Sequence, residues 1–289
     1  MGQRRFAAEG ALVAAAFLFG VTFPLVHDAL EDVTPFAYLV LRFSIAVIVL
    51  APFAVLVARR RGEDRRLLVR VGVIAGLLLF GGYAAQTVGL QYTTPSTSAF
   101  LTGLYVIFTP FVEAVVIRTR PTRIVVGSAL LATVGLYLLT GADLALGRGE
   151  LLTILCALIF AMWIVYQGRY AARIHPIPFT TLQMVTLVVV GIPAMARQGV
   201  GELTPTAWFA IVFTGIACSA VALSLQLWGQ QRIPPARAAL ILLLEPVFAG
   251  LISFLDGERL GAMEVVGALV ILGAILLAEL GPRRTSALV

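Results

Sequence analysis

The chain is a series of long apolar segments separated by short polar ones. A helix that crosses a membrane needs about 20 mostly apolar residues, and ten segments meet that requirement. We therefore expect ten transmembrane helices, at about residues 9–29, 35–58, 70–92, 96–117, 122–141, 149–170, 176–196, 206–231, 235–255 and 262–281. Little of the 289-residue chain is left for a soluble domain. The pattern predicts an all-α polytopic membrane protein.

Composition supports this interpretation and explains the net charge of +6. Hydrophobic residues make up 60% of the chain and charged residues 12%, against about 45–50% and 25% in soluble domains. All 21 basic residues are arginine, and most fall on the side that holds both termini if the loops alternate. Only Arg148, Arg197 and Arg259 fall on the other side, and Arg42 lies inside a span. The positive-inside rule then places both termini in the cytoplasm, so the charge reflects topology and not nucleic-acid binding.

The sequence also repeats itself with a shift of about 140 residues. Five residues of the first half match five of the second in the same order: Gln86, Gly89, Gln91, Pro95 and Ala99 fall on Gln226, Gly229, Gln231, Pro235 and Ala239. We expect two repeats, residues 1–145 and 146–289, with five spans each. Because five is odd, the second repeat enters the membrane from the opposite side. Secondary transporters often have such inverted repeats around a site near the midplane; the alternative is a duplication kept only for packing.

Four segments resemble a known family. They are "FLFGVTF" (17–23), "LRFSIA" (41–46), "YTTPSTSAFLTGLYVIFTP" (92–110) and "PPARAALILLLEPVFAGLISFLDGERL" (234–260). The chain resembles the EamA-like ten-helix members of the drug/metabolite transporter superfamily. The resemblance implies a transporter in a bacterial inner membrane that exports small metabolites, frequently amino acids, including aromatic ones. It also implies that the fifth helix of each repeat stands outside the cavity.

Two charged residues lie at membrane depth. An ionisable side chain there costs about 2.5–3.5 kcal/mol on insertion scales, so Arg42 and Glu245 are functional candidates. They could pair structurally, or Glu245 could bind a substrate amine or a coupling proton. Pro246 should kink the helix next to Glu245, and Pro110 is its repeat mate. We therefore group Arg42, Glu245, Pro246 and Pro110 as gating or ion-pair residues.

A polar stripe follows the expected helix at 96–117. Its members are spaced 4, 3, 4 and 4 residues apart and should share one helix face: Ser98, Thr102, Tyr105, Thr109 and Glu113. The first four are expected to line a cavity or to bond neighbouring helices. Other spans add amides and aromatic rings that suit a zwitterionic or polar substrate, although each ring alone also fits core packing. With Phe19 and Thr22 from the family motif, the predicted substrate-binding set is Phe19, Thr22, Tyr83, Gln86, Ser98, Thr102, Tyr105, Trp163, Tyr166, Gln226 and Gln230.

Several further functions are disfavoured. His27 and His175 fall in loops on opposite sides without metal-ligand spacing, and no catalytic motif is present, so we expect no metal, no cofactor and no enzyme activity. A nucleotide-sugar or phosphate-ester carrier would need several cations in the cavity, and only Arg42 is available. A broad drug/metabolite efflux carrier is the nearer alternative. The small-residue helices at 122–141 and 262–281 predict packing or a homodimer contact.

Overall fold

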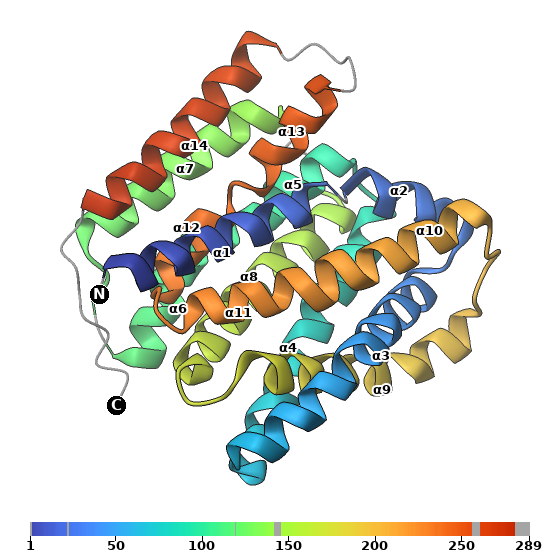
Figure 1. Ribbon diagram of the computed structural model, residues 1–289. Coiled ribbons are helices and arrows are strands. Elements are labelled where there is room, and N and C mark those ends of the chain that lie inside the picture. Colours follow the sequence, from blue (N-terminus) through green and yellow to red (C-terminus); the bar gives the residue numbers. More distant parts are fainter. Residues whose placement is uncertain (1, 22, 119, 142–145, 256–260, 281–289) are drawn as a thin grey trace.

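The computed structural model describes residues 2–21, 23–118, 120–141, 146–255 and 261–280, which are almost entirely helical (Figure 1). The described residues contain no strand beyond one isolated bridge between Val33 and Gly201. Eight helices are long and apolar enough to cross a membrane, and a shorter apolar helix runs from Ala262 to Ala278. The predicted all-α membrane fold is confirmed.

The first half contains seven helical segments: α1 (Gly2–Gly20), α2 (Phe23–Asp32), α3 (Pro35–Arg61), α4 (Arg65–Leu90), α5 (Pro95–Gly103), α6 (Tyr105–Ile117) and α7 (Arg123–Thr140). The second half contains α8 (Arg148–Ala171), α9 (Pro176–Gln198), α10 (Pro205–Thr214), the π-helical segment η1 (Gly215–Ala222), α11 (Leu223–Gln230), α12 (Pro235–Leu242), α13 (Glu245–Leu255) and α14 (Ala262–Leu280). The segments α10, η1 and α11 form one continuous rod.

Helix starts follow local sequence. Proline occupies the first position of α5 and of α12, where its fixed φ suits a helix and its missing N–H costs nothing. Thr94 caps α5 by accepting a hydrogen bond from the Thr97 amide at 3.2 Å. These signals fix the register of both helices, so residues at equal distance from the two prolines occupy equivalent helical positions.

The helices expected at residues 96–117 and 235–255 are each broken near the middle. α12 ends at Leu242, and α13 begins at Glu245 with Pro246 in its first turn, so the predicted kink is confirmed. The first-half break lies at Leu104, six residues before Pro110, which sits inside α6. The polar stripe at 98–113 was expected to follow one continuous helix. It is instead divided between α5 and α6.

Two antiparallel helix pairs frame the molecule. The start of α3 meets the end of α9 where the Thr34 hydroxyl donates to the Gly199 carbonyl at 2.7 Å. At their opposite ends, the His175 amide donates to Glu63 Oε1 at 2.7 Å. The pair α7 and α14 lies at the periphery (Figure 1) and approaches closely where Gly135 meets Gly267. Antiparallel packing of matching helices is the orientation that an inverted duplication requires.

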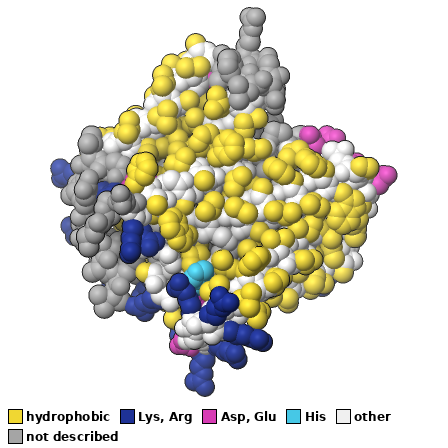
Figure 2. Space-filling model, in the orientation of Figure 1, with side chains coloured by type: hydrophobic (Ala, Val, Ile, Leu, Met, Phe, Trp, Pro, Cys, Tyr) yellow, Lys and Arg dark blue, Asp and Glu magenta, His cyan; other side chains and the backbone are white. Residues whose placement is uncertain are grey.

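The outer surface is suited to lipid. Figure 2 shows a face covered mainly by hydrophobic side chains, with arginine side chains gathered at its lower and left edges. Large apolar side chains such as Val115, Leu269 and Leu276 are more than 60% exposed. An apolar belt with basic residues at one rim is the surface expected of a membrane-spanning bundle.

Candidate functional site in a central cavity

A central cavity of about 870 Å³, which includes space open to solvent, lies between the two halves. Its lining brings together seven residues of the predicted substrate-binding set: Phe19, Tyr83, Gln86, Thr102, Tyr105, Trp163 and Gln226. Arg42 and Glu245 line the same space. The residues come from α1, α3, α4, α5, α6, α8, α11 and α13. Side chains distant in the sequence therefore meet in one chamber.

Arg42 is held firmly in one wall. Its Nε donates to Ser219 Oγ at 2.8 Å, and its guanidinium lies 5.2 Å from the ring centroids of both Phe43 and Tyr83. Close packing between α3 and η1 makes this contact possible, because a Cβ at Gly215 would lie 2.8 Å from the Arg42 carbonyl oxygen. A π-helical segment inside an α-helix often marks a functional site, and η1 carries the serine that holds Arg42.

Glu245 is the first residue of α13, directly after the break that separates α12 from α13, and it is partly exposed to the cavity. The end of α1 packs against this break, since a Cβ at Gly20 would lie 2.5 Å from the Glu245 carbonyl oxygen. Among the described residues, no nitrogen of Arg42 lies within 4.0 Å of a Glu245 oxygen. The direct ion pair, which the sequence left open as one of two alternatives, is therefore not formed, because Ser219 and the two rings hold the guanidinium on its own wall.

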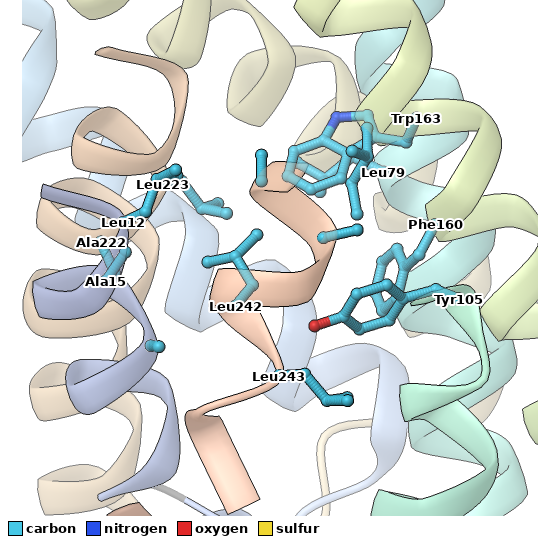
Figure 3. Close-up of a cluster of buried hydrophobic side chains, with 14 of the residues drawn as sticks. Leu12, Ala15, Leu79, Tyr105, Phe160, Trp163, Ala222, Leu223, Leu242 and Leu243 are labelled. Carbon is cyan, nitrogen blue, oxygen red and sulfur yellow. The ribbon is translucent and has the colours of Figure 1, made fainter. Parts of the chain in front are cut away.

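Aromatic rings form a third wall. Tyr83 and Phe160 meet edge to face with centroids 5.2 Å apart, and Phe160 lies 6.1 Å from Trp163. The indole Nε1 of Trp163 donates to Gln183 Oε1 at 2.7 Å, which fixes the ring. In Figure 3, Tyr105, Phe160 and Trp163 extend from α6 and α8 toward Leu242 of α12. This wall offers apolar contact next to the guanidinium of Arg42 and the carboxyl group of Glu245.

Two glutamine side chains reach the cavity from matching positions. Gln86 Nε2 donates to the Thr102 hydroxyl at 3.2 Å, so that amide has a partner within its own half. Gln226 is 2% exposed, and its Nε2 has no hydrogen-bond partner among the described residues. The side-chain amides of Gln86 and Gln226 occupy matching positions of the two repeats but differ in their hydrogen bonds.

The structure places other predicted residues away from this chamber. Gln230 accepts from Gln167 Nε2 at 2.6 Å and donates to the Ile164 carbonyl at 3.1 Å. The rings of Tyr166 and Tyr170 contact each other at a tilted angle of 54°, with centroids 5.2 Å apart. Ser98 is fully buried in α5 and Pro246 lies in the first turn of α13, and neither is part of the described lining. Pro110 lines a separate pocket, and Thr22 lies outside the described residues.

Several lining residues escaped the sequence analysis. Phe160 lies three residues before Trp163 on α8, a spacing that places the two rings on the same helix face. The remaining new members are Val26, Thr87, Leu90, Ile164, Leu223 and Leu242. Five of these six are apolar and resemble any other residue of a membrane helix, so only the fold identifies them.

At the arginine-rich end of the chamber, α6 of the first half packs against α12 of the second half. Glu113 Oε2 of α6 accepts a hydrogen bond from the Ala236 amide of α12 at 3.0 Å. Within the second half, Gln231 Nε2 donates to the Ala171 carbonyl at 3.1 Å near the same end. At the opposite end the lining reaches Leu90, the last residue of α4. The described lining therefore extends toward the end opposite the arginine-rich loops.

Comparison with known proteins decides the family. The model of the EamA-like transporter family matches residues 7–141 and again residues 147–280. The chain belongs to the EamA-like transporter family. An uncharacterized transporter of Archaeoglobus fulgidus is 32% identical over 281 residues, covering 96% of this chain and 88% of that protein. The uncharacterized transporter YyaM of Bacillus subtilis is 25% identical and covers 91% of each chain.

A solved crystal structure shares the fold of this EamA-like chain. Its TM-score is 0.77 at 20% sequence identity, and the match covers 94% of this chain and 96% of the other. This match shows the shared fold, whereas the family match and the names of the relatives support a membrane transporter. The described residues contain no group of three or more His, Cys, Asp or Glu side chains that could hold a metal ion.

Proposed function

We propose that this EamA-like protein exports amino acids, especially those with aromatic or hydrophobic side chains, across a bacterial inner membrane. The observation that carries the proposal is the joint presence of Arg42, Glu245 and an aromatic wall on one cavity. A zwitterionic amino acid has an anionic group, a cationic group and a side chain, and each finds complementary chemistry there. Phosphate esters fit less well, because Arg42 is the only cation in the described lining.

The proposed mechanism is alternating access between inverted halves, residues 1–145 and 146–289, with both termini cytoplasmic. Support comes from the family match to each half, from the antiparallel helix pairs, and from the breaks between α5 and α6 and between α12 and α13. The cytoplasmic halves of the two broken helices, α6 and α12, pack together. In the proposed cycle the closed end opens while α5 and α13 approach each other, which exposes the cavity to the opposite side.

The proposed coupling ion is a proton carried by Glu245. This carboxylic acid opens onto the cavity and has no hydrogen-bond partner among the described residues, so substrate and proton can compete for it. Competition of this kind links the movement of one species to the other. Glu245 would then bind the substrate ammonium in one half of the cycle and a proton in the other.

Transport by purified protein in liposomes tests the proposal. Vesicles loaded with a panel of labelled amino acids should release aromatic and large apolar members faster than protein-free vesicles. The panel should also include lipophilic amines without a carboxylate, because a broad drug efflux carrier would move these equally well. Release of none of the amino acids would overturn the proposed function, and preference for the amines would favour the efflux carrier.

A further inference from the structure

Gln226 differs from its repeat mate in one respect that matters for binding. Gln86 and Gln226 occupy equivalent positions nine residues before Pro95 and Pro235, the first residues of α5 and α12. In the first half, the Thr102 hydroxyl, seven residues after Pro95, accepts the Gln86 hydrogen bond. The equivalent residue seven after Pro235 is Leu242, which offers no acceptor.

Because leucine stands at 242 where the first half has Thr102, the side-chain amide of Gln226 has no acceptor beside the cavity. Thr102, Gln86, Gln226 and Leu242 all line the chamber, yet only the first-half pair is hydrogen-bonded. Buried N–H groups without an acceptor are rare in proteins, because a buried polar group that loses its hydrogen bonds to water must regain them within the fold or from a bound molecule. The second half therefore retains hydrogen-bonding capacity that the fold does not use.

The terminal amide of Gln226 can present this donor to a ligand. In the structure the nitrogen is covered, and the side chain borders the cavity. The last side-chain torsion of glutamine has a broad, roughly two-fold profile, so half a turn exchanges the amide nitrogen and oxygen. An unpartnered buried carbonyl is tolerated better than an unpartnered buried N–H. A hydrogen-bond acceptor in the cavity would thus favour the orientation in which Gln226 Nε2 faces the cavity.

We propose that Gln226 is a specificity-determining residue that donates a hydrogen bond to the substrate carboxylate, and that Leu242 keeps this donor free of a partner within the chain. The inference rests on the proposed function, since an amino acid with an apolar side chain has its carboxylate as its main acceptor. Arg42 supplies a positive charge to the same cavity but is anchored at its Nε by Ser219. Gln226 supplies the directional contact.

Binding of two probes to the full-length protein in nanodiscs tests the inference. L-Phenylalanine carries both an ammonium and a carboxylate, whereas 2-phenylethylamine lacks only the carboxylate. Gln226→Leu should weaken phenylalanine binding about tenfold, or about 1.4 kcal/mol, and leave phenylethylamine binding unchanged. Leu242→Thr should have the same selective effect with the glutamine in place, because the new hydroxyl mimics Thr102 and engages the amide internally.

Gln167→Leu is the matched control. Gln167 is equally buried, at 1% exposure, and bonds Gln230 away from the described lining. Its replacement should lower thermal stability while preserving the ratio of the two probe affinities. An unchanged ratio in both Gln226→Leu and Leu242→Thr would overturn the inference while leaving the proposed function intact. If the wild-type protein binds neither probe, the proposed function fails and the inference falls with it.

Discussion

Glu113 of α6 accepts a hydrogen bond at 3.0 Å from the backbone amide of Ala236, in the first turn of α12. This contact joins the two halves of the chain at the arginine-rich end of the cavity. A carboxylate at a helix N-terminus satisfies an amide that lacks an intrahelical partner and also interacts favourably with the helix dipole. The equivalent position in α13, three residues after Pro246 as Glu113 is after Pro110, is Ala249. The carboxylate is thus present in only one half.

We predict that Glu113→Ala weakens closure of the arginine-rich end. A hydrogen bond to a charged group contributes about 1.5–3 kcal/mol, enough to change the closed population roughly tenfold or more. Hydrogen exchange of peptides covering residues 232–240 in nanodiscs should become faster. Glu264→Gln is the control, because Glu264 binds the Gly261 amide at the start of its own helix and touches no gate. Unchanged exchange in Glu113→Ala would remove Glu113 from the closure.

Although the expected span 9–29 is divided between α1 and α2, the sequence predicted most other helical spans, the break at Pro246 and most of the charged and aromatic cavity residues. These succeeded because membrane helices impose long apolar runs, and because polar side chains within them must face protein or water. The sequence did not predict the break at Leu104, because the nearest helix-breaking proline, Pro110, lies six residues later and inside α6. It also did not show that Gln230 would bond Gln167, since helical spacing gives a face but not the partner across it.

The second prediction concerns Glu245. If this residue carries the coupling proton, Glu245→Gln should abolish acceleration of amino-acid efflux by a proton gradient, because glutamine cannot gain and lose a proton. Exchange of labelled for unlabelled substrate without a gradient should continue at a measurable rate. Liposome assays at several external pH values, with and without an ionophore, measure both quantities. A Glu245→Gln protein that still responds fully to the gradient would exclude this residue from coupling.

The third prediction concerns the positioning of Arg42. Ser219→Ala removes the oxygen that accepts from Arg42 Nε, so the guanidinium should lose its fixed orientation. We expect amino-acid binding to weaken about tenfold, which corresponds to about 1.4 kcal/mol and lies near the lower end of the range for a hydrogen bond to a charged group. Ser224→Ala is a matched control, since Ser224 bonds the Ala220 carbonyl in its own helix. Equal affinities for the two variants would show that the Ser219 contact is dispensable.

The fourth prediction concerns the glycine contact between α7 and α14. Gly267→Ala would place a Cβ 2.5 Å from the Gly135 carbonyl oxygen and against the Leu139 amide nitrogen. Such overpacking typically costs about 1–3 kcal/mol, so the midpoint of thermal unfolding in detergent should fall. Gly273→Ala in the same helix meets nothing within 4 Å and should be neutral or stabilising. A stable Gly267→Ala protein would mean that the two helices can separate without loss.

This close contact also bears on oligomerisation. The small residues of α7 and α14 were expected to form packing or dimer surfaces, and the structure uses Gly135 and Gly267 within one chain. A homodimer through the outer faces of these helices stays a prediction. Those faces carry exposed apolar side chains such as Leu130, Val134 and Leu269. Measuring the mass of the protein in nanodiscs would show whether two chains associate.

The last prediction concerns pH and His175, which lies outside the spans. Its Nδ1 accepts a hydrogen bond from the Ile177 amide at 3.3 Å, which only the neutral ring can do. Burial, and next the positive charge of Arg61, lower the pKa of His175 below its usual 6.5, while Glu63 acts in the opposite direction. Folding therefore favours the neutral ring. This stabilisation is present above about pH 6.5 and is lost as the pH falls toward the lower folded-state pKa.

Thermal unfolding between pH 8 and pH 5 measures this effect. His175→Asn should retain a side-chain cap for α9 without a titrating group, so its stability should fall less than that of the wild type as the pH is lowered. Glu63→Gln keeps an oxygen for the His175 amide but removes the charge that raises the His175 pKa. The pKa should then fall further, and the loss of stability should extend to lower pH. Identical pH profiles for all three proteins would show that His175 does not contribute to the pH dependence of stability.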